Sequence, residues 1–120
     1  MSLSATGFDD ALDYKVIHET ASTNTLNTNV ATTEGKLFSV KLVNGSSSAA
    51  YLKIFDANKP VIGTTSPIII LPVAGSGTIF YDIPGGIEFT TLSFASTLNP
   101  NPLDATAPSG STVAVTLVCG

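Results

Sequence analysis

Apolar and polar residues alternate along several short stretches of this chain, which is the pattern of strands with one buried face. In residues 36–44 the side chains of Phe38, Val40 and Leu42 share one face, and residues 112–119 show the same alternation. Turn-forming residues separate these stretches, and none of them has the apolar spacing of an amphipathic helix. The seven expected strands cover residues 12–19, 36–44, 51–56, 67–72, 78–83, 87–97 and 112–119.

The residues between the strands predict how neighbouring strands connect. The turn-rich segment 44–48 lies between residues 36–44 and 51–56 and favours a hairpin that joins them. Pro84-Gly85-Gly86 predicts another turn, between the strands at 78–83 and 87–97.

Three segments of the chain predict irregular backbone. Within residues 87–97 the apolar positions change parity, so we expect a bulge or bend near Thr90-Thr91. Residues 20–34 are rich in Thr and Asn, whose side chains hydrogen-bond to nearby backbone, and we expect a long polar loop in which a short piece of ladder could form. A second long loop is expected over residues 99–111.

Seven short strands separated by turns predict an all-β fold, a single antiparallel β-sandwich with a jelly-roll-like or an immunoglobulin-like strand order. A length of 120 residues suits one domain. We assign residues 12–120 to the β-sandwich domain and residues 1–11 to an extended N-terminal arm. Leu3 and Phe8 are isolated apolar residues of that arm, and we expect them to fill pockets on a neighbouring protein as the arm adds to a sheet edge.

Charged residues are scarce, at 12% of the chain, whereas soluble domains average roughly 25%. Such a surface predicts that other protein covers much of it in the working state. The net charge is −4, and all five basic residues are lysines. Because nucleic-acid binding needs clustered positive charge and favours arginine, this composition argues against a nucleic-acid partner.

The sequence also argues against a membrane protein. Its longest run without a polar side chain is residues 67–75, far short of the roughly 20 apolar residues of a membrane-spanning helix. The first residues lack a positively charged segment followed by an apolar one. We therefore expect a soluble protein that is made inside a cell.

Candidate catalytic and metal-ligating residues are few. His18 is the only histidine, and no serine lies in a Gly-x-Ser-x-Gly elbow, so we expect a surface histidine rather than a catalytic one. Asp9, Asp10 and Asp13 lack the ligand spacing of a calcium loop and favour a solvated arm. Cys119 is the only cysteine, which excludes an internal disulfide and favours a small apolar role over a bridge between copies. We expect no enzyme activity, cofactor or metal.

Phosphate and sugar sites are no better supported. Gly75-x-Gly77 precedes a strand pattern and not a helix, so it predicts a turn. A glycosidase would need two acidic residues that face each other across a cleft. A sugar-binding face would need exposed aromatic residues, yet tryptophan is absent and the three tyrosines fall at expected packed positions of strands. The acids and aromatic residues considered are Asp56, Asp82, Glu88, Tyr14, Tyr51 and Tyr81.

The chain contains four short motifs of strand and turn residues: Tyr51-Leu-Lys-Ile-Phe-Asp-Ala, Gly63-Thr-Thr-Ser-Pro, Leu71-Pro-Val and Gly85-Gly-Ile-Glu-Phe. Together they resemble a pattern in small virion-associated proteins of tailed phages. The match covers roughly residues 36–118 and leaves out the arm and the polar loop. The resemblance implies a structural role without catalytic residues, above all that of a capsid decoration or cement protein, which is often a trimer.

These observations favour a phage virion structural protein that is made in the host cytoplasm and assembles into the virion. Its expected partners are the major capsid protein or another virion protein and further copies of itself, with a trimer favoured. A tail, baseplate or fibre component would share this composition but attach at few copies per particle. A carbohydrate-binding or adhesion module is the alternative from another functional class, and an enzyme is the weakest.

Overall fold

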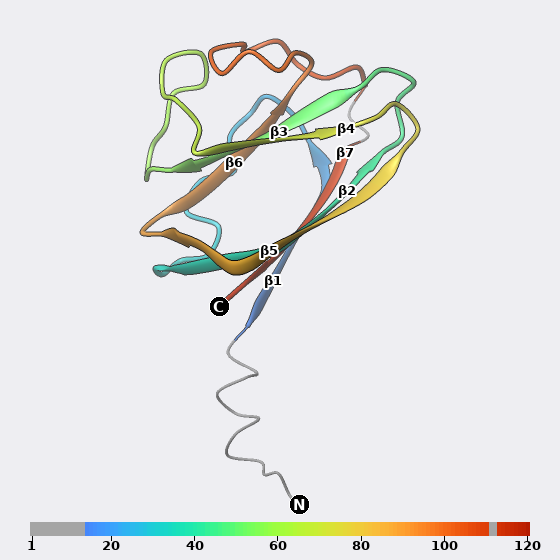
Figure 1. Cartoon of the computed structure of the whole chain (residues 1–120). Coiled ribbons are helices and arrows are strands. Elements are labelled where there is room, and N and C mark those ends of the chain that lie inside the picture. The colour runs from blue at the N-terminus through green and yellow to red at the C-terminus, as the bar shows by residue number, and fades with distance from the viewer. Residues whose placement is uncertain (1–13, 111–112) are drawn as a thin grey trace, which may run out of the picture.

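The computed structural model describes residues 14–110 and 113–120, which form two antiparallel β-sheets packed face to face (Figure 1). One sheet has four strands in the order β1-β7-β2-β5, and the other has three in the order β4-β3-β6. This confirms the all-β sandwich. The strands are β1 (Lys15–Ser22), β2 (Gly35–Asn44), β3 (Ala50–Asp56), β4 (Ile69–Val73), β5 (Thr78–Phe89), β6 (Leu92–Thr97) and β7 (Val113–Cys119).

The strand order differs from that of a constant immunoglobulin domain, in which the first and second strands are neighbours. Here β7 lies between β1 and β2, so the first described strand pairs with the last. The arm proposed for residues 1–11, with Leu3 and Phe8, lies outside the described residues.

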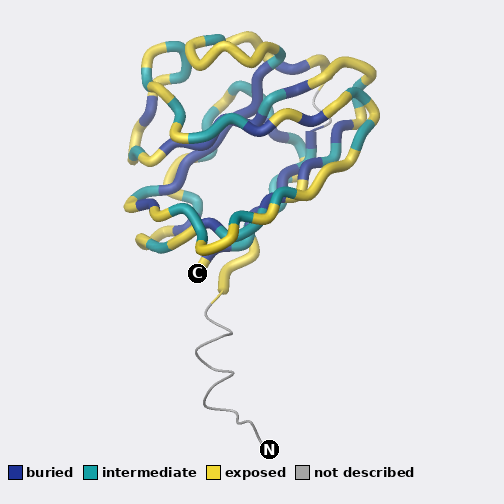
Figure 2. Tube along the Cα trace, viewed as in Figure 1, coloured by how far each residue is buried: buried dark blue, intermediate teal, exposed yellow. Residues whose placement is uncertain are grey.

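The core forms between the inner faces of the two sheets. The alternation expected at the end of the chain is confirmed, because Val113, Val115 and Leu117 of β7 are all buried in this core. Leu52 and Ile54 of β3 meet them from the other sheet. Figure 2 shows these buried strands between exposed stretches of chain.

The hairpin expected between residues 36–44 and 51–56 is wrong, because β2 and β3 belong to different sheets. The side chain of Asn44 is buried and organises the crossing connection. Its Nδ2 donates to the Ser48 carbonyl at 2.8 Å, and its Oδ1 accepts from the Ser46 N–H at 3.0 Å. Turn residues therefore mark the end of the strand here, but the chain crosses to the other sheet instead of folding back beside β2.

The turn expected at Pro84-Gly85-Gly86 is also wrong, because β5 continues through these residues as one strand. They belong to a bulge: the pairing with β2 passes from Ser39–Asp82 to Leu37–Ile87. Residues 83–86 therefore lie opposite Phe38 alone.

Because of the bulge, the side chain of Phe38 on β2 points to the outer face of the sheet and not to the core. Phe38 was expected to share the core face with Val40 and Leu42, and this is wrong. Leu37 is fully buried in the core, whereas Phe38 is half-buried and its ring meets that of Tyr14 edge-on, with centroids 5.5 Å apart. An irregularity in the ladder shifts the side-chain alternation by one residue, as a register slip does.

The break expected near Thr90-Thr91 is confirmed and ends a strand. Asp56 at the end of β3 accepts hydrogen bonds through Oδ1 from the N–H groups of Thr90 and Thr91, each at 2.9 Å. The chain turns there from β5 in one sheet to β6 in the other.

The polar loop expected over residues 20–34 begins after Ser22, where β1 ends. Part of it pairs with the edge of β6, since the Asn27 N–H donates to the Phe94 carbonyl and the Phe94 N–H to the Asn27 carbonyl, both at 2.9 Å. The short piece of ladder considered for this loop is therefore present.

Candidate interaction surface

The outer faces of the two sheets differ in what covers them. Every residue of β6 is buried, including those that point away from the core. In β3 the outward-facing Lys53 and Phe55 are also fully buried, because connecting segments cover this side of the three-stranded sheet (Figure 1). The loop expected over residues 99–111 forms part of that cover, as far as it is described.

Lys53 fastens this loop to the sheet. Its Nζ donates to the backbone carbonyls of Asn101 and Asp104, the latter at 2.9 Å. Burial lowers the pKa of the Lys53 ammonium, and the nearby Asp104 charge offsets part of that effect. The sequence does not predict this contact. A lysine within an apolar strand is usually read as a residue of an exposed sheet edge, and the partners of Lys53 are about fifty residues away in the chain.

Asp104 shapes the loop itself. Its carboxylate accepts hydrogen bonds from the Thr106 hydroxyl at 2.8 Å, from the Thr106 N–H at 3.3 Å and from the Asn99 N–H at 3.3 Å. Burial raises the pKa of Asp104, but these hydrogen bonds outweigh it and hold the pKa below its ordinary value. The loop is thus a compact, internally bonded cover.

The outer face of the four-stranded sheet has no such cover among the described residues, and we call it the open face. Val16 on β1 is 69% exposed and Phe80 on β5 is 67% exposed. The polar groups between them are engaged: Lys41 Nζ lies 5.5 Å from the Phe80 ring centroid, and His18 Nδ1 is 2.8 Å from the Thr116 hydroxyl. The strand register places on this face Val16, His18, Lys41, Phe80, Thr116 and Val118.

The tyrosines are not all packed as expected. Tyr14 is 54% exposed next to the open face, so that part of the prediction is wrong. Tyr51 and Tyr81 are half-buried, and the Tyr81 hydroxyl donates to the Pro72 carbonyl. Burial raises the pKa of Tyr81. The aromatic residues that could contact a ligand are therefore Tyr14 and Phe80.

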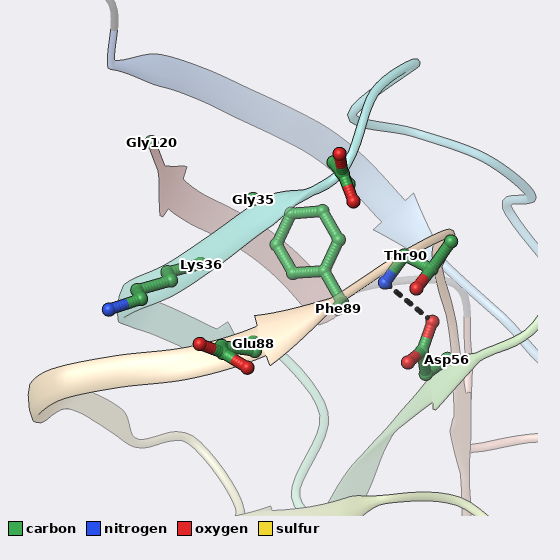
Figure 3. Close-up of a pocket in the computed structure, with 8 residues that line it drawn as sticks. Gly35, Lys36, Asp56, Glu88, Phe89, Thr90 and Gly120 are labelled. Carbon is green, nitrogen blue, oxygen red and sulfur yellow. Dashed lines mark hydrogen bonds between the residues drawn. The ribbon is translucent and has the colours of Figure 1, made fainter.

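A pocket of about 580 Å³ opens where the ends of β2, β3 and β5 meet (Figure 3). The Phe89 ring lies at its centre, with Asp56 bonded to Thr90 on one side and the side chains of Lys36 and Glu88 on the other. Asp56 and Glu88 thus line one pocket from opposite sides of the Phe89 ring, whereas Asp82 does not line it. The lining residues are Glu34, Gly35, Lys36, Asp56, Glu88, Phe89, Thr90 and Gly120.

This pocket offers little reactive chemistry. Asp56 Oδ1 already accepts two backbone N–H groups and holds the corner between β5 and β6. Within the described ranges, no three His, Cys, Asp or Glu side chains lie close enough together to hold a metal ion. The pocket is best described as a shallow acidic depression with an aromatic floor.

The structure also shows where the other candidate residues of the sequence lie. His18 is exposed, and Gly75-Ser76 forms a turn between β4 and β5. Cys119 is 2% exposed in the core. Burial raises its pKa to about 11, with a smaller opposite effect from Lys15. A thiol so placed is protonated at neutral pH and is not presented to a second copy.

Two sets of candidates cannot be placed. Leu3 and Phe8, expected to bind a partner, and Asp9, Asp10 and Asp13 lie outside the described residues. In the part of the chain that is described, no helix could cross a membrane. Comparisons with protein-family models, with curated proteins and with solved structures find no match for this chain.

Proposed function

We propose that this chain is a structural protein of a tailed-phage virion, made in the host cytoplasm, and specifically a decoration protein that binds the outside of the capsid. In this role it stabilises contacts between major capsid subunits and performs no catalysis. The observation that carries the proposal is the asymmetry between the sheets: one covers its own outer face, while the open face exposes Val16 and Phe80 with few charges.

An open, flat and sparsely charged sheet face suits adhesion to protein. Covering its apolar side chains with another protein removes them from water, which lowers the free energy of the complex. The scarcity of charge, at 12% of the chain, lowers the cost of desolvating such a contact. The resemblance to virion-associated proteins supports a capsid as the surface that is bound, and it favours a trimer.

The binding test uses capsids assembled from the major capsid protein of the particle that contains this chain. Phe80→Asp replaces an exposed apolar ring of the open face with a charge, and we expect at least a tenfold loss of affinity in co-sedimentation. Val61→Asp is the matched control, because Val61 is 58% exposed but lies in the connection after β3. Equal binding by both variants would exclude the open face.

Copy number separates the possible positions in the virion. Quantitative mass spectrometry of purified particles should find hundreds of copies of a decoration protein. A few copies per particle would identify a tail, baseplate or fibre component instead, and absence from particles would reject the virion role.

A carbohydrate-binding or adhesion module is the second candidate, favoured by the exposed Tyr14 and Phe80. Exposed aromatic rings are the usual platforms for sugars. Phe80 lies on the edge strand β5, whereas the Tyr14 ring lies against that of Phe38 on β2, with centroids 5.5 Å apart. Binding to a glycan array that Tyr14→Ala or Phe80→Ala removes would support this function over capsid attachment.

A further inference from the structure

Every open sheet has edge strands whose free N–H and C=O groups can pair with another chain, and proteins usually block them. Two of the four edges here are blocked, and a third is partly blocked. Residues 23–30 cover β6, with the Val30 N–H donating to the Leu92 carbonyl at 2.8 Å and the Ser96 N–H donating to the Thr23 carbonyl at 2.9 Å. β4 contains Pro72, which has no N–H. β5 is partly blocked by the bulge at residues 83–86, although its residues 78–82 pair regularly with β2.

The edge formed by β1 carries no proline or bulge along residues 15–19 and no covering segment among the described residues, and its two charged residues are Lys15 and Glu19. These residues pair regularly with β7, from Lys15–Cys119 to Glu19–Val115, and the ladder becomes irregular only beyond Glu19. On the other side of β1, no segment of residues 14–110 or 113–120 pairs with it. Five residues of regular strand are therefore open to a partner strand.

The charges on this edge identify the partner as a second copy. Lys15 and Glu19 lie on the same side of β1, two residues to either side of Ile17. An antiparallel copy centred on Ile17 places each Lys15 opposite the other copy's Glu19, so two complementary pairs form at once. Opposite charges that face each other across strands stabilise a sheet, and like charges destabilise it.

We propose that β1 pairs antiparallel with β1 of a second copy, Ile17 opposite Ile17, and joins the two four-stranded sheets into one. The register places Val16 of each copy opposite His18 of the other, so the open faces become continuous across the two-fold axis.

Neighbouring registers lack this complementarity. Centring the pair on Lys15 or on Glu19 brings like charges together, and centring it on Val16 or His18 leaves Lys15 and Glu19 opposite other residue types. Two polar contacts hold the Lys15 side chain in place: its Nζ donates to the Ala31 carbonyl at 2.6 Å and lies 3.1 Å from the Thr32 hydroxyl. An ammonium group has three donors, so one remains for a carboxylate.

The pair has two-fold symmetry and predicts a dimer instead of the trimer that the resemblance favours. The inference does not depend on attachment to a capsid. One edge strand contributes less than the roughly 1,200 Å² of a stable interface, so the association is weak and depends on concentration.

Analytical ultracentrifugation of the full chain from ~1 μM to ~1 mM tests the proposal. We expect a monomer–dimer equilibrium. Lys15→Glu and Glu19→Lys each place like charges opposite each other and should weaken it at least tenfold, while the double reversal restores it. Lys59→Glu is the matched control, because Lys59 is exposed in the connection after β3, away from β1.

A trimer, a monomer at every concentration, or a double reversal that does not recover would overturn the proposal. Because Lys15→Glu also removes the bond to Ala31, amide hydrogen exchange on the unaltered chain supplies a second measurement. Protection of the β1 amides should rise with protein concentration, and protection that does not change counts against the pair. Neither result bears on copy number in particles, so the virion role is judged separately.

Discussion

Lys53 shows how a single residue can determine what a sheet presents to its surroundings. It is the largest fully buried side chain of the described chain, and its ammonium group is satisfied by loop carbonyls and not by a carboxylate. Because this amine fastens the loop, the outer face of β3 and β6 is withdrawn from contact with other proteins.

Replacing Lys53 with Met should therefore destabilise the fold and release the loop. The carbonyls of Asn101 and Asp104 lose their donor, and unsatisfied polar groups of this kind cost about 1–3 kcal/mol. Chemical denaturation measures the loss, and hydrogen exchange should show faster exchange at residues 98–110 and in β6. Lys59→Met, at an exposed position, should change stability by less than about 0.5 kcal/mol. Unchanged exchange in the loop would contradict the role given to Lys53.

Cys119 predicts a loss of stability in alkaline solution. Burial raises its pKa from 9.0 to about 11, so between these values the unfolded chain binds fewer protons than the native protein. The free energy of unfolding therefore falls as pH rises through this interval, while the full contribution is present below pH 9. The expected loss is about 2–3 kcal/mol.

Denaturation at a series of pH values in the wild type and in Cys119→Ala checks this prediction. The alanine variant retains the titration of Tyr81 and Lys53 but should lose the part of the slope that comes from the thiol. Parallel profiles for the two proteins would show that Cys119 does not carry the dependence.

At the scale of elements, the bulge between β2 and β5 depends on two glycines with positive φ. Gly85 has φ +80° and Gly86 has φ +76°. A Cβ at Gly85 would meet nothing within 4 Å, whereas a Cβ at Gly86 would lie 2.9 Å from the Lys36 Cβ and 3.0 Å from the Phe38 ring. Comparing the same substitution at the two positions therefore separates the cost of backbone strain from the cost of steric overlap.

Gly85→Ala should cost about 1–2 kcal/mol from the left-handed backbone alone. Gly86→Ala should cost more, because Phe38 must also move away from its contact with Tyr14. Thermal or urea denaturation of both variants gives the comparison. Equal losses would mean that the bulge accommodates the extra methyl group without moving Phe38.

The alternation of β7 and of residues 39–44 predicted correctly which side chains are buried, because period-two burial is a local property of a strand. Local sequence could not place Phe38, since its facing depends on a bulge formed with a strand about forty residues away. The turn residues 44–48 marked the end of β2 correctly but did not identify the sheet that the chain enters next. Pro84-Gly85-Gly86 marked a bulge within β5 and not a strand end. The cover over the three-stranded sheet depends on the contact of Lys53 with Asn101 and Asp104, a long-range contact that no local pattern predicts.

Considered as a whole, the molecule depends on pairings between distant parts of the chain. β1 pairs with β7, β2 with β5, and β3 with β6, so the strands that carry the core meet only after long loops close. Loop closure costs entropy before such contacts form, and β-sandwiches of this kind fold in about milliseconds to seconds.

Stopped-flow refolding should give a main phase in that range. Slower phases that arise from proline isomers of the unfolded chain should disappear in double-jump experiments. A main phase of microseconds would indicate that the first structure to form is local.

The pairing of Lys15 with Cys119 has a mechanical consequence. These residues lie at the same end of an antiparallel ladder, so tension applied between them pulls the two strands apart from that end. The hydrogen bonds then break one after another, as in a zipper, and not all together as in shear. A pulling experiment through these two positions should open the domain at low force, whereas the same molecule pulled along its strands should resist far more.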